Sequence, residues 1–307
     1  MALALVLAGG WRFSGSVCPG GRSRCRETNL VLTGVAQRRT LALFGDLEDD
    51  NDSSADVDSL RDSTASITSS ILEYRNINGR KYQSSNTTEY CHQFTLMLME
   101  DELFQAPLSD SPQKILDVGT GTGIWAIDIA DEYPSAEVLG FDISAVQPSW
   151  VPPNCSFQID DAQLDWTFKP NEYDLIHMRY LYGGIDNWDK LYLQAFTHVR
   201  PGGWVENTEI DLETRSENPK VADDPSHIFK KWCNLFWEAG DKIGRTFKIA
   251  REGQMEQKMR EAGFVDVQHR QWKVPIGGWP QDPKALPYYN VHTVIGRKPE
   301  TAPAATN

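Results

Sequence analysis

This chain of 307 residues has few cysteines, no long apolar run and no concentrated basic patch. Its five cysteines are scattered without a CxxC pair, which excludes a zinc ribbon or a disulfide framework and favours a reducing compartment. No apolar stretch approaches the roughly 20 residues that a membrane-spanning helix needs. The formal net charge is −13, whereas a nucleic-acid-binding surface needs clustered lysine and arginine. We therefore expect no membrane partner and no direct nucleic-acid partner.

The N-terminal region has an uneven charge distribution. The first 45 residues contain six arginines and a single acid, Glu27, whereas residues 46–62 carry eight acids against Arg61. An arginine-rich, acid-poor start fits a mitochondrial transit segment, but also an unstructured extension or a start codon placed too far upstream. Residues rich in Asp and Ser cannot bury enough apolar surface to become ordered alone. We expect residues 1–68 to be a disordered or targeting-like extension with an acidic linker, in a cytoplasmic or nuclear protein.

Residues 69–107 are predicted to form an N-terminal helical cap segment. We expect a short helix within 69–83 that leads into a turn at Asn78-Gly79. Apolar residues recur at helical spacing further on and predict a second helix over 88–103.

Residues 108–298 alternate between strand-like and helix-like segments. This alternation predicts an α/β fold, a Rossmann-like doubly wound sheet of about seven strands, mostly parallel with an antiparallel C-terminal hairpin strand. The chain would close with a disordered tail, 299–307. We expect the strands at 114–119, 137–143, 155–160, 173–180, 201–211, 265–276 and 288–298, and helices at 123–133, 188–199, 224–244 and 250–264.

The stretch LDVGTGTG places Gly119, Gly121 and Gly123 directly after the first predicted strand of the sheet, at the start of a helix. Glycine permits a tight turn and a close approach of the backbone to a ligand, and a helix N-terminus adds unpaired N–H groups. Asp142 closes the next strand, where an acid suits the two hydroxyls of a ribose. This combination predicts an adenosine-containing ligand, although a glycine turn can also serve strand–helix packing alone.

The glycine spacing is G-x-G-x-G, one residue shorter than the dinucleotide fingerprint G-x-G-x-x-G. Asp117 stands two residues before Gly119, where a carboxylate would be a poor neighbour for a pyrophosphate but a good one for an ammonium group. Both features favour S-adenosylmethionine over a nicotinamide dinucleotide, which remains the competing interpretation.

The segment Leu116–Ser144 resembles the first two motifs of class I S-adenosylmethionine-dependent methyltransferases, and more narrowly the LaeA-like fungal methyltransferases of secondary metabolism. The resemblance continues through YDLIHMRYLYGGIDNWDKLYLQAFTHVRPGGWVENTEID and spans most of 64–297. It implies S-adenosyl-L-methionine as the cofactor. The residues that would bind it are Asp117, Gly119, Thr120, Gly121 and Gly123 at the methionine end, Asp142 at the ribose, Ile143, Asp161 and Ala162 around the adenine, and His177.

His177 is also the best titratable candidate for a general base, because it lies at the carboxyl end of its predicted strand, where ligands bind in open α/β sheets. A lone histidine on a strand is more often a hydrogen-bonded packing residue, and methyl transfer to an activated nucleophile needs positioning more than a strong base. No group of residues has metal-ligand spacing, so we expect no metal.

Two segments are shorter than the resemblance implies, one before the helix at 88–103 and one between the last two strands, and both would help to cover the substrate. Two functions remain open. The chain would methylate a small molecule of fungal secondary metabolism, or a protein. Alternatively, it would be a non-catalytic or weakly catalytic LaeA-like regulator of secondary-metabolite gene clusters that works through protein partners.

Overall fold

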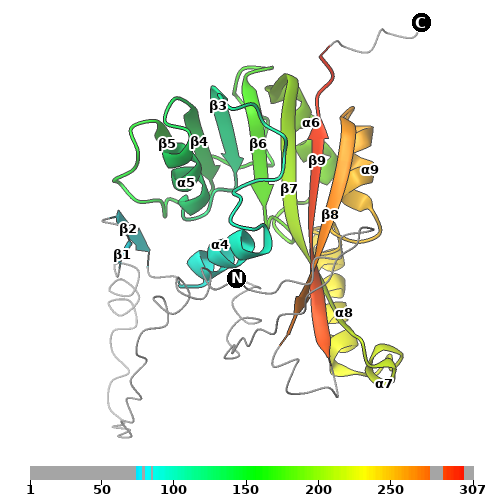
Figure 1. Cartoon of the computed structure of the whole chain (residues 1–307). Coiled ribbons are helices and arrows are strands. Elements are labelled where there is room, and N and C mark those ends of the chain that lie inside the picture. The colour runs from blue at the N-terminus through cyan, green and yellow to red at the C-terminus, as the bar shows by residue number, and fades with distance from the viewer. Residues whose placement is uncertain (1–73, 78–79, 84–85, 277–285, 301–307) are drawn as a thin grey trace, which may run out of the picture.

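The computed structural model describes residues 74–77, 80–83, 86–276 and 286–300. The expected extension at 1–68 and most of the expected tail lie outside these ranges. The main feature is a seven-stranded sheet in the order β5-β4-β3-β6-β7-β9-β8 (Figure 1). Its strands are β3 (Lys114–Val118), β4 (Glu137–Asp142), β5 (Cys155–Ile159), β6 (Tyr173–Arg179), β7 (Val199–Ser216), β8 (Val265–Pro275) and β9 (Pro287–Arg297).

The strand directions confirm the predicted fold class. The pairs β3–β4, β3–β6, β4–β5 and β6–β7 are parallel, whereas β9 runs antiparallel to both β7 and β8. The order of the parallel strands reverses next to β3, because β4 lies on one side of it and β6 on the other. In open α/β sheets, ligands bind at such a reversal, outside the carboxyl ends of the strands.

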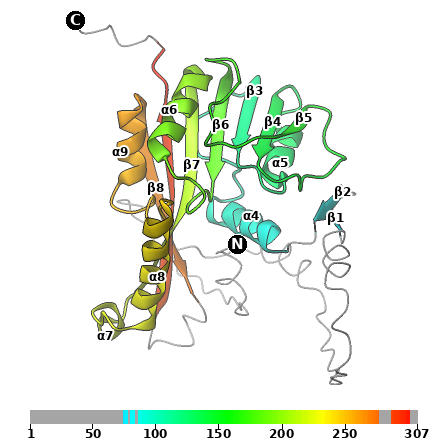
Figure 2. The same ribbon diagram turned by 180° about the vertical axis from the view of Figure 1, so that it is seen from behind.

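Helices cover both faces of the sheet. On one face, α5 (Ile124–Glu132) packs over Ile115 and Leu175 in one apolar cluster. On the other face, α6 (Trp188–His198) and α9 (Gln254–Glu261) belong to a second apolar cluster, which also contains Leu116 and Ile176 (Figure 2). Adjacent residues of a strand therefore enter opposite cores, as the two-residue period of a strand requires. The helix α8 (Ile228–Ile243) lies on the same side as α9, preceded by the short α7 (Pro219–Ala222).

The helix α4 (Asn86–Leu98) lies across the carboxyl end of β6 (Figure 1). The hydroxyl oxygens of Thr95 in α4 and Tyr180 just after β6 are 2.5 Å apart. This helix confirms the helix predicted at 88–103, although it ends five residues earlier than expected, before Glu100 and Asp101, which adopt positive φ.

Two sequence-based expectations are wrong in detail. The described part of 69–83 forms a hairpin of β1 (Tyr74–Ile77) and β2 (Arg80–Gln83) instead of a short helix. The Asn78-Gly79 dipeptide that separates these strands is a strong hairpin signal, which outweighed weak helical periodicity. The strand β7 is also longer than 201–211, because its second half continues to pair with β9 as far as Ser216.

Candidate functional site

The glycine loop lies between β3 and α5, at the carboxyl edge of the sheet. Its three glycines have φ values of 68°, 56° and 79°, a conformation that favours glycine. The loop is tied to the neighbouring strand, since the N–H groups of Gly119 and Thr120 both donate to the carbonyl of Phe141. A Cβ on Gly121 would have no atom within 4 Å, whereas one on Gly123 would lie 2.3 Å from the ring of Phe157. Gly121 therefore borders open space, and Gly123 serves packing.

Asp142 connects the end of β4 to this loop. Its Oδ2 accepts a hydrogen bond of 2.9 Å from the N–H of Gly121, and its Oδ1 accepts one of the same length from the N–H of Ser144. The side chain of Ile143, between them, is 71% exposed. The acid and the glycine loop that the sequence pairs by spacing thus form one unit, with an exposed apolar side chain beside it.

The segment after β5 lies beside Asp142. The N–H of Asp160 donates to the carbonyl of Asp142 at 3.1 Å, and Asp161 Oδ1 accepts from the N–H of Gln163. The carbonyl of Ala162 accepts from Trp166 Nε1 and Gln194 Nε2 and is fixed by them. The chain therefore brings Asp142, Asp161 and Ala162 together at the ends of adjacent strands β4 and β5.

Asp117 and His177 form a buried pair on adjacent strands. His177 Nδ1 lies 2.7 Å from Asp117 Oδ1, Thr120 Oγ1 donates to Asp117 Oδ2 at 2.5 Å, and the imidazole stacks on Trp125 with ring centroids 3.7 Å apart. Only 2% of His177 is exposed, and burial lowers the pKa of its imidazole, an effect that Asp117 partly opposes. This environment favours a neutral imidazole that holds Asp117 in place.

A second histidine that the sequence did not single out is also buried. His92 of α4 has its Nε2 2.9 Å from Asp128 of α5 and its Nδ1 3.0 Å from a guanidinium nitrogen of Arg179. Because the arginine can only donate, His92 Nδ1 accepts and its Nε2–H donates to Asp128. Burial lowers the pKa of His92. This chain of three side chains joins α4, α5 and the end of β6, and nothing in their sequence spacing marks it.

Two glutamates of β7, Glu206 and Glu209, are fully buried. Glu206 Oε2 accepts from the N–H groups of Gln105 and Ala106, and Glu209 accepts from those of Leu181 and Tyr182. Burial raises the pKa of Glu206 to about 7 and that of Glu209 to about 8, against the effect of these hydrogen bonds. Both acids organise loops instead of facing solvent.

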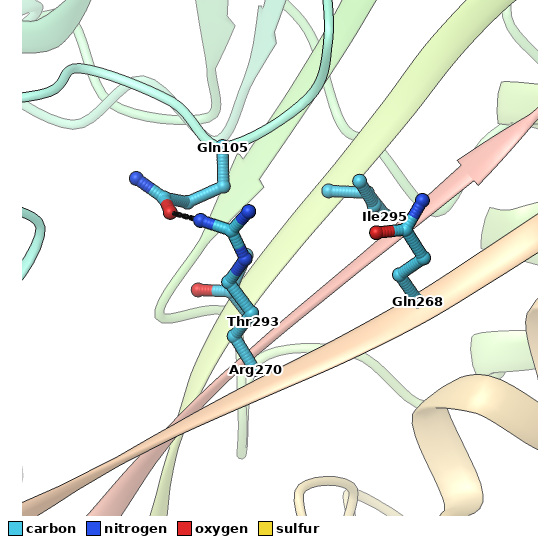
Figure 3. A pocket seen from close by; sticks show the side chains of 5 residues that line it. All are labelled: Gln105, Gln268, Arg270, Thr293 and Ile295. Atoms are coloured by element: carbon cyan, nitrogen blue, oxygen red, sulfur yellow. Dashed lines mark hydrogen bonds between the residues drawn. The ribbon is translucent and has the colours of Figure 1, made fainter. Parts of the chain in front are cut away.

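A small crevice lies beside β8 and β9 (Figure 3). Its lining residues are Gln105, Gln268, Arg270, Thr293 and Ile295, and Arg270 donates a hydrogen bond to the Gln105 side chain. None of the residues expected to bind a cofactor lines it. The crevice is therefore separate from the glycine-loop site.

Within the described parts of the chain, no group of three His, Cys, Asp or Glu side chains is arranged to hold a metal ion. The helices in those parts are also too short or too polar to cross a bilayer.

A protein-family model described as a methyltransferase domain matches residues 88–269. The methyltransferase pytC of Aspergillus terreus is 37% identical over 246 residues, which cover 75% of this chain and 74% of that protein. This chain belongs to the methyltransferase domain family. The secondary metabolism regulator LAE1 of Cochliobolus heterostrophus is 41% identical over 197 residues, which cover 62% of this methyltransferase and 63% of LAE1.

Among solved structures, phosphoethanolamine N-methyltransferase 2 of Haemonchus contortus, in complex with S-adenosyl-L-methionine, is 17% identical. The match has a TM-score of 0.44 and covers 63% of this methyltransferase and 50% of that chain. The family model and the curated relatives confirm the resemblance to the LaeA-like methyltransferases that the sequence motifs predict.

S-adenosylmethionine is the cofactor of this methyltransferase, and the residues at the carboxyl edge fit it. Gly121 leaves open space over the loop, and the exposed face of Ile143 offers apolar surface beside it. The Asp142 carboxylate accepts hydrogen bonds from two backbone N–H groups and retains lone pairs for further donors such as ribose hydroxyls. The individual binding roles of these residues stay predictions.

Proposed function

We propose that this methyltransferase transfers a methyl group to a small-molecule acceptor at the carboxyl edge of β3, β4 and β6. The observation that carries the proposal is the hydrogen bond between Asp142 and Gly121, which joins the predicted ribose-binding acid to the glycine loop. When bound, S-adenosylmethionine supplies a methyl group on a sulfonium that already contains the leaving group. The protein then has to bind the cofactor and the acceptor, orient them toward each other and exclude water.

In this proposal each residue has a binding or holding role. Asp142 accepts hydrogen bonds from the ribose hydroxyls. Asp161 and the Ala162 backbone meet the adenine. Asp117 provides negative charge near the amino group, and His177 keeps its carboxylate oriented. The burial of His177 supports a positioning role over that of a base acting on the acceptor.

The transfer of a methyl group is supported by the likeness to the methyltransferase pytC, which extends over about three quarters of both chains. A protein acceptor is the alternative within the same chemistry. We place the protein in the cytoplasm or nucleus, as its scattered cysteines favour a reducing compartment.

A second candidate function is regulation of secondary-metabolite gene clusters through protein partners. It is favoured by the 41% identity to the regulator LAE1 over 197 residues. The match spans less than two thirds of LAE1, so this function stays a proposal.

The first experiment is calorimetric titration of the purified protein with S-adenosylmethionine, S-adenosylhomocysteine and NADH in parallel. Micromolar binding of the first two ligands, and none of NADH, supports the methyltransferase proposal. Binding of NADH alone overturns it, and binding of none favours the regulator.

The ribose role is tested by the variant Asp142→Ala. We expect it to keep the fold and to lose most of its affinity for S-adenosylhomocysteine, since one charge-assisted contact is worth about 1.5–3 kcal/mol. The matched control is Asp165→Ala, which removes the same charge from an exposed acid paired with Lys190. Equal affinities in the two variants would remove Asp142 from the ribose role.

A further inference from the structure

The loop after β6, residues 180–184, is held in place by a buried carboxylate from the neighbouring strand. Glu209 of β7 is 0% exposed, and its two oxygens accept hydrogen bonds from the N–H groups of Leu181 at 3.0 Å and Tyr182 at 3.2 Å. The loop begins at Tyr180 with a φ of 59°, an uncommon conformation for a residue other than glycine. Such a conformation persists where the surroundings enforce it.

The loop so held contacts the glycine loop. A Cβ added to Gly119 would lie 2.5 Å from Leu181 Cδ2, so the Leu181 side chain packs directly against the Gly119 backbone. The loop has further anchors on either side of Leu181. Tyr180 contacts Thr95 of α4, and the N–H of Gly183 donates to the carbonyl of Thr246. Glu209 alone among these anchors acts on the N–H of Leu181 itself.

We propose that Glu209 is a positioning residue whose carboxylate fixes Leu181 against Gly119 and thereby sets the affinity of the glycine loop for the amino-acid end of the cofactor. This inference rests on the proposed methyltransferase function, and it adds a residue that contacts neither cofactor nor acceptor.

The two hydrogen bonds require the ionised form of Glu209. A carboxylate offers acceptors on both oxygens, whereas a protonated carboxyl turns one oxygen into a donor, which opposes the second N–H. Burial raises the pKa of Glu209 to about 8. The titratable groups that face it are Tyr180 and Tyr182 of the loop, Tyr192 of α6 and the cross-strand neighbour His292 of β9. None of these groups is a lysine or arginine, whose positive charge would stabilise the carboxylate and lower its pKa. The loop therefore gains its second hydrogen bond only as pH rises through about 8 and Glu209 ionises.

Glu206 provides a matched control on the same strand. It is equally buried and also accepts from two consecutive backbone N–H groups, those of Gln105 and Ala106. It lies three positions before Glu209 in the strand, and because this offset is odd its side chain lies on the opposite face of the sheet. Its partners belong to the loop beside the crevice of Figure 3, away from Gly119.

The experiment measures the affinity for S-adenosylhomocysteine from pH 6.5 to 8.5 in the wild type, Glu209→Gln and Glu206→Gln. We expect the affinity of the wild type and of Glu206→Gln to rise about tenfold as pH passes through 8, compared with the affinity of Glu209→Gln. The size follows from the cost of leaving one buried N–H group without an acceptor. The ligand's own amino group titrates equally in all three proteins, so the difference between variants reports Glu209. Parallel pH profiles in all three would overturn the proposal.

A ligand-free measurement separates this inference from the cofactor assignment. Amide hydrogen exchange should accelerate at residues 180–184 in Glu209→Gln and at residues 105–106 in Glu206→Gln. In each variant the other segment should exchange at the wild-type rate. Failure of S-adenosylhomocysteine to bind the wild type would count against the methyltransferase function, whereas unchanged exchange at 180–184 would count against Glu209.

A second variant tests the route through Leu181. Leu181→Ala should keep the hydrogen bonds to Glu209, because they involve the backbone N–H groups, but should lose the side-chain contact with Gly119. We expect the affinity of this variant to lose its dependence on pH around 8. A wild-type pH profile in Leu181→Ala would overturn the proposed route.

Discussion

His177 and Asp117 lie on adjacent parallel strands with Nδ1 and Oδ1 2.7 Å apart, and both side chains are almost completely buried. The pair stands directly below the glycine loop, because Thr120 donates to the second oxygen of Asp117. The histidine that the sequence offers as a base is therefore part of the support of the loop.

This pair predicts a stability effect. His177→Phe should keep the stack on Trp125 but leave Asp117 Oδ1 without its donor. We expect a loss of about 1–3 kcal/mol in the free energy of unfolding, measured by urea denaturation. The control Met178→Leu, on the opposite face of the same strand, should cost less than about 1.5 kcal/mol. An equal or smaller loss in His177→Phe would show that the hydrogen bond contributes little.

The glycines of the loop should separate folding from binding. Gly123→Ala places a Cβ 2.3 Å from Phe157 at a φ of 79°, so its melting temperature should fall clearly. Gly121→Ala meets open space and carries only the backbone strain, about 1–2 kcal/mol. We expect Gly121→Ala to remain folded and to lose affinity for S-adenosylhomocysteine. Normal affinity in Gly121→Ala would show that the open space over this glycine is not the cofactor site.

The buried glutamates predict how stability depends on pH. Glu209 has a folded pKa of about 8 against an ordinary value of 4.5, so between these values the folded protein binds more protons than the unfolded chain. Its contribution to stability is then fully present below about pH 4.5 and is lost as pH rises toward 8, with a slope of up to about 1.4 kcal/mol per pH unit.

The same reasoning applies to Glu206 up to about pH 7. Buried histidines such as His92 and His177 have lowered pKa values and act in the opposite direction, but only below their ordinary value of 6.5. Urea denaturation between pH 7 and 8 should therefore show a stability that falls with pH in the wild type and a flatter profile in Glu209→Gln. Identical slopes would contradict the raised pKa.

Asp174 should matter for folding alone. This carboxylate lies at the amino end of β6, where Oδ2 accepts from the N–H groups of Gln113 and Lys114 and Oδ1 accepts from Arg200. We expect Asp174→Ala to lower the free energy of unfolding by about 3 kcal/mol, since it removes three hydrogen bonds to a buried carboxylate. Its affinity for S-adenosylhomocysteine should stay at the wild-type level, because this end of the sheet is opposite the glycine loop. A lower affinity in the folded variant would contradict that separation.

The sequence by itself determined the alternation of strands and helices, the glycine loop and the acid that ends the next strand. These features are local, because hydrophobic period, glycine conformation and the position of a residue at a strand end depend on nearby residues. Asp142 and Gly121 could be paired from the sequence because a parallel sheet brings the ends of adjacent strands to one edge.

Only the tertiary structure decided what surrounds each polar side chain. Glu209 meets Leu181 and Tyr182, and His92 meets Arg179 and Asp128, across long separations in the chain. Neither set of contacts leaves a pattern in the sequence. For Glu209 the reason is that its carboxylate accepts from backbone N–H groups, which every residue except proline has. The burial of His177 likewise depends on Trp125 stacking over it. Burial and partner, which set pKa and role, arise when the layers pack together.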